Sequence, residues 1–170
     1  MTARVVIGVM GAGEDARETD IALAEELGEL LACEGWIVLT GGRDAGVMAA
    51  AARGAKRVDG SVTIGILPGA AGGTAPHIDI AIYTGMGEAR NVINILSSRA
   101  VITCGFINPG TAIEAALAIK NRRPLILLRP NSEAEAFFRG ALVARTAEEA
   151  VGFVRRALAM ASASLERSAE

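Results

Sequence analysis

Short apolar runs of strand length alternate along this chain with segments that have the 3.6-residue period of amphipathic helices. Strands are expected at residues 4–9, 36–40, 62–67, 78–82, 100–104 and 124–128. The segments between them carry helical stripes, as at Ile21, Ala24, Leu27, Leu30 and Leu31. Consecutive parallel strands need crossover helices, and such crossovers are right-handed. The pattern therefore predicts an α/β fold of Rossmann type, with a doubly wound, mostly parallel sheet and helices on both faces.

The end of the chain departs from this regular alternation. We expect a short helix at residues 133–138, an edge strand at 142–144 and a final helix at 147–165. Thr146 and Glu149 have the spacing of a capping box at the start of that last helix. The sequence contains neither an internal repeat nor a linker long enough to separate domains, so residues 1–170 are predicted to form a single domain.

The composition agrees with this fold and argues against several classes of partner. Hydrophobic residues make up 51% of the chain and aromatic residues only 4%, which is typical of a parallel sheet buried between helices. The net charge is -2 and no cluster of Lys and Arg is present, so no nucleic-acid partner is expected. No apolar stretch reaches the roughly 20 residues that cross a membrane, so no membrane partner is expected either.

The cysteines and the histidine are few and isolated. Cys33 and Cys104 lack the spacing of a redox or metal motif, and the first strand begins without a signal peptide. We expect both thiols to be free and buried in a reducing compartment, the cytoplasm. His77 has no Cys or His partner at ligand spacing, so no metal site is expected.

Ligands of doubly wound sheets bind beyond the carboxyl ends of the strands, where this chain has four glycine-containing turns. In the first turn, Gly11 and Gly13 allow backbone N–H groups to approach an oxyanion, or simply permit a tight turn. In the second, Gly41 and Gly42 free the backbone beside Arg43. That arginine either pairs with a phosphate or carboxylate or is an ordinary surface residue.

The third turn, at residues 84–91, contains Thr84 and Gly85 and leads into a helix. Arg90 is expected in the first turn of that helix, where a cation opposes the helix dipole. The placement indicates an anionic partner, either Glu114 or a ligand. The alternative is a solvated helix start.

The fourth turn, at residues 108–114, is the most specific. It begins with Asn108, and Gly110 lets the backbone approach a ligand closely. Thr111 is expected to be the N-cap of a helix, within reach of a phosphate, and Glu114 its capping-box carboxylate. Taken alone, this turn favours a purely structural cap. The gathering of four such turns at one sheet edge favours a site for a small, phosphate-bearing molecule.

Five segments carry a resemblance to a known superfamily. They are GWIVLTGGRDAGVM (35–48), TIGILPG (63–69), HIDIAIYTG (77–85), GEARNVINILSS (87–98) and PGTAIEAALAIK (109–120). They resemble the proteins often mislabelled "lysine decarboxylase", which include the LONELY GUY phosphoribohydrolases and, as the nearer branch, the molybdenum cofactor carrier proteins. The resemblance covers nearly the whole chain and is most specific at the LTGG, LPG, ARN and PGTxxE blocks.

The enzyme branch of this superfamily has the motif PGGxGTxxE and an upstream arginine. The resemblance matches Gly110, Thr111 and Glu114 to the end of that motif, and Arg90 to the arginine. It implies hydrolysis of the N-glycosidic bond of a nucleoside 5'-monophosphate such as AMP, with Arg90 and Glu114 as the catalytic residues. A carboxylate near C1' can stabilise an oxocarbenium-like transition state, and an arginine keeps that carboxylate ionised.

The chain departs from the enzyme pattern at residues 105–110, which read Gly-Phe-Ile-Asn-Pro-Gly. The carrier branch has a proline before Gly-Thr, so Pro109 favours a carrier that protects molybdenum cofactor and delivers it to apo-molybdoenzymes. The protein need supply no metal ligand, because the dithiolene of the pterin carries the molybdenum. The expected cradle consists of Gly11, Gly13, Gly41, Gly42, Arg43, Thr84, Gly85, Arg90, Asn108, Gly110, Thr111 and Glu114.

Two further expectations concern function and assembly. A non-catalytic nucleotide-binding protein is the third possibility beside carrier and enzyme. Apolar residues expected on helix surfaces, Val92, Leu96, Val154 and Leu158, indicate a homodimer or homotetramer, as the family resemblance also implies.

Overall fold

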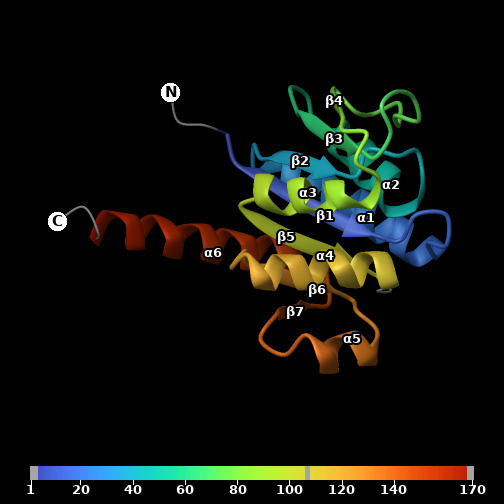
Figure 1. The fold of residues 1–170 in the computed structure, drawn as a ribbon. Helices are drawn as coiled ribbons and strands as arrows, with labels where there is room; N and C mark the ends of the chain where they lie inside the picture. Colours follow the sequence, from blue (N-terminus) through green and yellow to red (C-terminus); the bar gives the residue numbers. More distant parts are fainter. Residues whose placement is uncertain (1–3, 106–107, 168–170) are drawn as a thin grey trace.

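The computed structural model describes residues 4–105 and 108–167, and these form one seven-stranded sheet (Figure 1). The strands are β1 (Val6–Gly11), β2 (Ile37–Thr40), β3 (Thr63–Leu67), β4 (Ile80–Tyr83), β5 (Ala100–Cys104), β6 (Leu125–Leu128) and β7 (Leu142–Ala144). All neighbouring pairs are parallel, in the order β4-β3-β2-β1-β5-β6-β7. The chain builds outward from β1 to β4 and then crosses back to β5, so the winding direction reverses between β1 and β5. The expected Rossmann-type α/β fold is confirmed.

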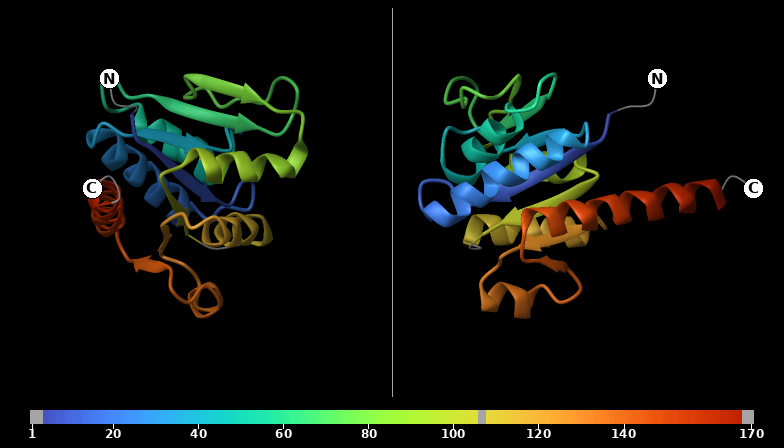
Figure 2. Two further views of the ribbon diagram at one scale, coloured as in Figure 1. Left: turned by 60° about the vertical axis from the view of Figure 1, so that its left-hand side comes forward. Right: turned by 180° about the vertical axis from the view of Figure 1, so that it is seen from behind.

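Helices cover both faces of the sheet (Figure 2). One face carries α1 (Glu18–Cys33), α2 (Gly46–Ala55) and α6 (Ala147–Arg167). The other carries α3 (Asn91–Ser97), α4 (Pro109–Lys120) and α5 (Ser132–Phe137), and a single 3-10 turn, Gly87–Arg90, leads into α3. Among the described residues, no helix is long and apolar enough to span a bilayer.

Glycines let α1 and α2 pack backbone to backbone. A Cβ on Gly28 of α1 would overlap the carbonyl oxygen of Ala51, and one on Gly54 of α2 would overlap that of Glu25. Arg53 of α2 donates to the Glu25 carboxylate at 2.6 Å, on the outer side of the same contact. The backbones of the two helices therefore lie in direct contact on one face of the sheet.

The final helix begins as expected, but more of its apolar surface is buried than expected. Glu149 donates its backbone N–H to the Thr146 hydroxyl at 3.2 Å, and its carboxylate accepts from the N–H of Arg145. Val154 is fully buried because α6 packs across the sheet. It therefore cannot contribute to a surface for a second copy. Leu158 packs against the same core and is only partly buried.

The two cysteines differ in burial. Cys104 is buried in β5, but Cys33 is exposed, so the expectation of two buried thiols was wrong for Cys33. The reason is that Cys33 lies seven residues after the exposed Glu26, on the stripe of α1 that faces away from the sheet, whereas its neighbour Ala32 is buried.

Candidate functional site

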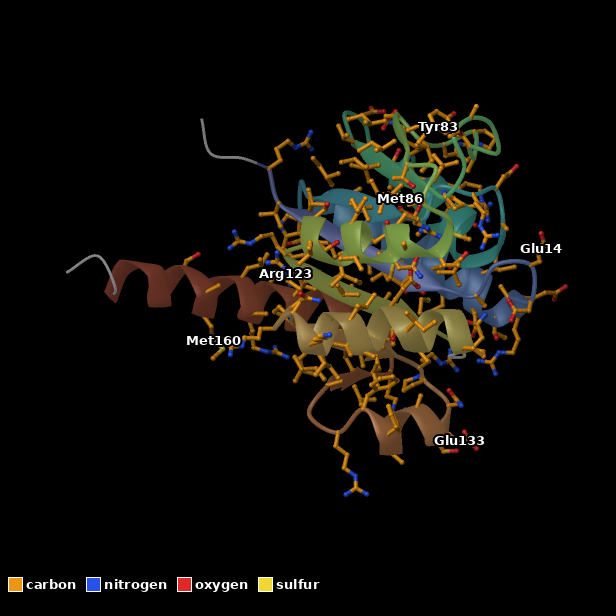
Figure 3. All side chains as sticks on the ribbon, viewed as in Figure 1. Glu14, Tyr83, Met86, Arg123, Glu133 and Met160 are labelled. Carbon is orange, nitrogen blue, oxygen red and sulfur yellow. The ribbon has the colours of Figure 1, made fainter. Side chains whose placement is uncertain are left out.

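A pocket of about 390 Å³ opens at the carboxyl ends of β1 and β5, where the winding reverses. In Figure 3 the labelled Glu14 marks this edge of the sheet. The pocket is lined by Met10, Gly11, Gly13, Glu14, Asp15, Gly41, Arg43, Met48, Glu88, Arg90, Asn91, Asn108, Gly110, Thr111 and Glu114. These residues come from the end of β1 and the loop after it, from the loop after β2 and the start of α2, from the 3-10 turn and the start of α3, and from the loop after β5 and the start of α4.

The structure brings nine of the twelve expected residues together in this pocket: Gly11, Gly13, Gly41, Arg43, Arg90, Asn108, Gly110, Thr111 and Glu114. Gly42, Thr84 and Gly85 are not among its lining residues. Gly42 packs on Gly65 of β3, and the Thr84 hydroxyl donates to the Leu67 carbonyl at 2.9 Å. These residues shape the neighbouring turns.

Six lining residues escaped the sequence analysis: Met10, Glu14, Asp15, Met48, Glu88 and Asn91. Glu14 and Asp15 directly follow the first glycine turn, so extending that turn by two residues would have found them. Met10 and Met48 have the appearance of core residues in the sequence and are in fact almost fully buried. No local signal distinguishes them from the rest of the core.

Arg90 is the most unusual residue of the pocket. Only 3% of it is exposed, and its Nε and Nη1 atoms have no hydrogen-bond partner among the described residues. The guanidinium lies against Gly41 at a distance that leaves no room for a Cβ there. Burial lowers the pKa of Arg90, and Arg43 acts in the same direction, while Glu114 and Glu88 raise it. A buried guanidinium with an unpaired Nε and Nη1 is costly, so the pocket is arranged to receive an anion.

Glu114 lies in the same pocket and is 7% exposed. Burial raises the pKa of this carboxyl to about 7, against the lowering effects of Arg90 and of a hydrogen bond from Asn94. Asn94 of α3 donates its amide to the carboxylate at 3.3 Å. Near neutral pH the carboxyl is therefore partly protonated, and it can donate as well as accept a hydrogen bond.

The start of α4 differs from the expectation. Its N-cap is Asn108, whose Oδ1 accepts from the Thr111 N–H at 2.9 Å and from the Thr111 hydroxyl at 3.0 Å. Thr111 is thus not the N-cap, and Glu114 is not a capping-box carboxylate. An asparagine followed by Pro109 is an equally good helix start, one turn earlier. Glu114 is consequently free to face the pocket.

Asn108 also connects two walls of the pocket. Its amide donates to both carboxylate oxygens of Asp15, at 2.9 and 3.2 Å, which ties the loop after β5 to the loop after β1. Phe106 and Ile107, where the sequence departs from the enzyme pattern, lie outside the described ranges.

The charges of the pocket have both signs. Arg43 and Arg90 contribute positive charge, and the carboxyl groups of Glu14, Asp15, Glu88 and Glu114 surround them. In the part of the chain that the structure describes, no three His, Cys, Asp or Glu side chains are grouped to hold a metal ion. The main chain of His77 accepts a hydrogen bond from the Thr63 hydroxyl of β3 at 2.6 Å, and His77 is not among the residues that line the pocket. The arrangement suits a ligand with an anionic group and several N–H donors.

Comparisons with known proteins agree with this fold. A molybdenum cofactor binding protein from Rippkaea orientalis is 43% identical, with a TM-score of 0.90 over 93% of this chain and 99% of that one. The Moco carrier protein of Chlamydomonas reinhardtii is 44% identical, with a TM-score of 0.86 over 93% and 99%. An uncharacterized protein of Archaeoglobus fulgidus is 42% identical over 147 residues, 86% of this chain and 92% of that protein.

Two DNA processing proteins A, from Streptococcus pneumoniae and Helicobacter pylori, share the fold with 16% and 20% identity. At this level of identity the likeness concerns the fold alone. The sequence model of the SLOG cluster4 family matches residues 4–154 of this chain. This match spans all seven strands of the sheet, every wall of the pocket and the first part of α6, and the chain therefore belongs to the SLOG cluster4 family.

Proposed function

We propose that this protein binds molybdenum cofactor as cargo in the pocket at the β1–β5 switch point, protects it and delivers it. The observation that carries the proposal is Arg90, a buried guanidinium whose Nε and Nη1 find no partner among the described residues. A phosphate group would satisfy them with charge-assisted hydrogen bonds. The similarity to two proteins named for this cofactor, each over almost its whole length, supports the choice of ligand.

The two kinds of charge in the pocket fit the two ends of such a ligand. Its phosphate fits the region of Arg90 and Arg43, next to the glycine turn after β1. Its pterin carries an amino group and ring N–H groups, which can donate hydrogen bonds to carboxylates. Glu88 and Glu114 line the same pocket and offer such acceptors. The cofactor's own dithiolene holds the molybdenum, so a pocket without a metal-ligand cluster is sufficient.

The test is retention of the cofactor by the purified protein. The apo-protein is mixed with molybdenum cofactor without oxygen and passed through a desalting column, and bound molybdenum is measured. We expect retention by the natural chain and loss of it in Arg90→Met, which keeps the volume but removes the charge. Arg99→Met is the matched control, because Arg99 is exposed at the opposite, amino end of β5. Equal retention in all three proteins would sink the proposal.

A phosphoribohydrolase is the second candidate, favoured by the presence of both Arg90 and Glu114 in one pocket. A carboxyl whose pKa is raised to about 7 suits general acid or base work at neutral pH. Incubation with AMP and other nucleoside monophosphates, followed by chromatography for free base, tests this function. Base release that disappears in Glu114→Gln supports an enzyme. Tight AMP binding without release supports the third candidate, a nucleotide-binding protein without catalysis.

The proposal extends to assembly, partners and location. The outer sides of α3 and α4 expose Val92, Leu96, Ile113 and Ile119, with exposed fractions from 39% to 54%. We propose that this apolar surface pairs copies of the chain into a homodimer or homotetramer, which light scattering on the purified protein checks.

Apo-molybdoenzymes are the proposed recipients of the cofactor. Two free thiols, one of them exposed, suit the cytoplasm as the compartment.

A further inference from the structure

A second cavity, of about 320 Å³, adjoins the pocket on the side of β3. It is lined by Glu14, Arg43, Asp44, Ala45, Leu67, Pro68, Gly69, Gly72 and Gly73. Glu14 and Arg43 line both cavities, so the two spaces meet at these side chains. The two cavities therefore lie next to each other on either side of Glu14 and Arg43, and together they are called the groove below.

We propose that this groove accepts a nucleotide-extended ligand: a diphosphate lies beside Arg43, one end of the ligand occupies the first pocket, and a guanine-type nucleoside occupies the second cavity. The identity of the first end as a pterin rests on the proposed function. The nucleoside site rests on the second cavity and can be tested without the pterin.

Arg43 stands at the junction of the two cavities. Its Nη2 lies 3.7 Å from the position that a Cβ on Gly13 would take, so the guanidinium lies over the glycine turn after β1. Its backbone forms an antiparallel bridge with Thr74, and Ala75 donates to the Gly42 carbonyl at 2.9 Å. The loop after β3 thus holds the backbone of Arg43 in place. A planar guanidinium with five N–H donors can bridge two adjacent phosphates.

The loop after β3 offers further donors to the second phosphate. Among the described residues, the N–H groups of Ala70, Ala71, Gly72 and Gly73 take part in no backbone hydrogen bond. Gly72 and Gly73 both have φ 71°, and nothing lies within 4 Å of where their Cβ atoms would be. Bare backbone of this kind lets a phosphate oxygen approach the N–H groups closely.

The remaining walls suit a flat base. Ala45, Leu67 and Pro68 provide apolar contact, and Asp44 places a carboxylate at the rim. Guanine presents an amino and a ring N–H side by side, which one carboxylate can accept together, as it accepts a guanidinium. Adenine lacks the ring N–H at that edge. The groove should therefore prefer guanine.

The experiment measures the affinity of the apo-protein for GDP, GMP and ADP by calorimetry. We expect GDP to bind about tenfold more tightly than GMP, because the second phosphate adds contacts to Arg43 and the loop, and also more tightly than ADP. Asp44→Asn should reduce the affinity for GDP to that for ADP. Asp59→Asn, which changes an exposed carboxylate between α2 and β3, is the matched control and should change nothing.

The outcomes separate this inference from the proposed function. Equal affinities for GDP and GMP, no binding of either, or equal weakening by Asp44→Asn and Asp59→Asn would overturn the nucleoside site. Retention of molybdenum cofactor with no gain for GDP leaves the carrier function standing without the extension. A gain for GDP with no retention of the cofactor keeps the nucleoside site and rejects the cargo.

Discussion

Glu114→Gln should stabilise the folded chain at neutral and high pH, but not near pH 4.5. In the folded chain the carboxyl has its pKa raised from the ordinary 4.5 to about 7, and burial is the main cause. It therefore holds its proton more tightly folded than unfolded. The side chain imposes no penalty below about pH 4.5, a penalty that grows as the pH rises from about 4.5 to about 7, and a constant one at higher pH.

The magnitude follows from the two pKa values. At about 1.4 kcal/mol per pH unit, the difference between 4.5 and about 7 amounts to a loss of about 3 kcal/mol in the free energy of unfolding above about pH 8. Glutamine resembles the protonated carboxyl and can still accept the hydrogen bond from Asn94. The variant should match the natural chain near pH 4.5 and exceed it by up to about 3 kcal/mol at high pH.

Urea unfolding of both proteins at about pH 5, 7 and 8.5 measures this difference. Glu133→Gln is the control, because Glu133 is exposed and its pKa is lowered by hydrogen bonds from its own backbone, Asn131 and Ser132. This control should show no gain in stability with rising pH. A Glu114→Gln effect of the same size at every pH would refute the reasoning, since a titrating penalty must vary with pH.

Three further predictions concern packing and reactivity. Gly28→Ala should destabilise the chain by about 2 kcal/mol or more, because its Cβ meets the backbone of α2. Gly152→Ala should not destabilise it, because a Cβ there has only a side chain nearby, at 3.8 Å. Urea unfolding of the two variants compares these effects. Gly41→Ala should weaken pyrophosphate binding about tenfold in a thermal-shift titration, because the Cβ displaces the buried guanidinium. Cys33 should react with a thiol reagent in the folded protein, whereas Cys104 should react only on unfolding, because burial raises the pKa of its thiol.

The periodicity of the sequence is sufficient to predict the strands and the last two helices to within a few residues. The strand at 100–104 and the edge strand at 142–144 match β5 and β7 at both ends, and 124–128 differs from β6 by one residue. Apolar spacing acts locally, through burial of one side of a helix or of both sides of a strand, so it can be read along the chain. The rule that ligands bind beyond the carboxyl ends of parallel strands then indicated the edge of the sheet at which the pocket lies.

Only the tertiary structure decided which turns enclose the pocket, which turns support neighbouring strands, and how deeply their side chains are buried. The turns after β1, β2 and β5 enclose the pocket, while Thr84 and Gly85 support the end of β3, because the crossover from β4 to β5 fixes which turns meet. The burial of Arg90 against Gly41 and the raised pKa of Glu114 arise from contacts between residues far apart in the sequence. Such desolvation depends on neighbours in space, and no local pattern encodes it.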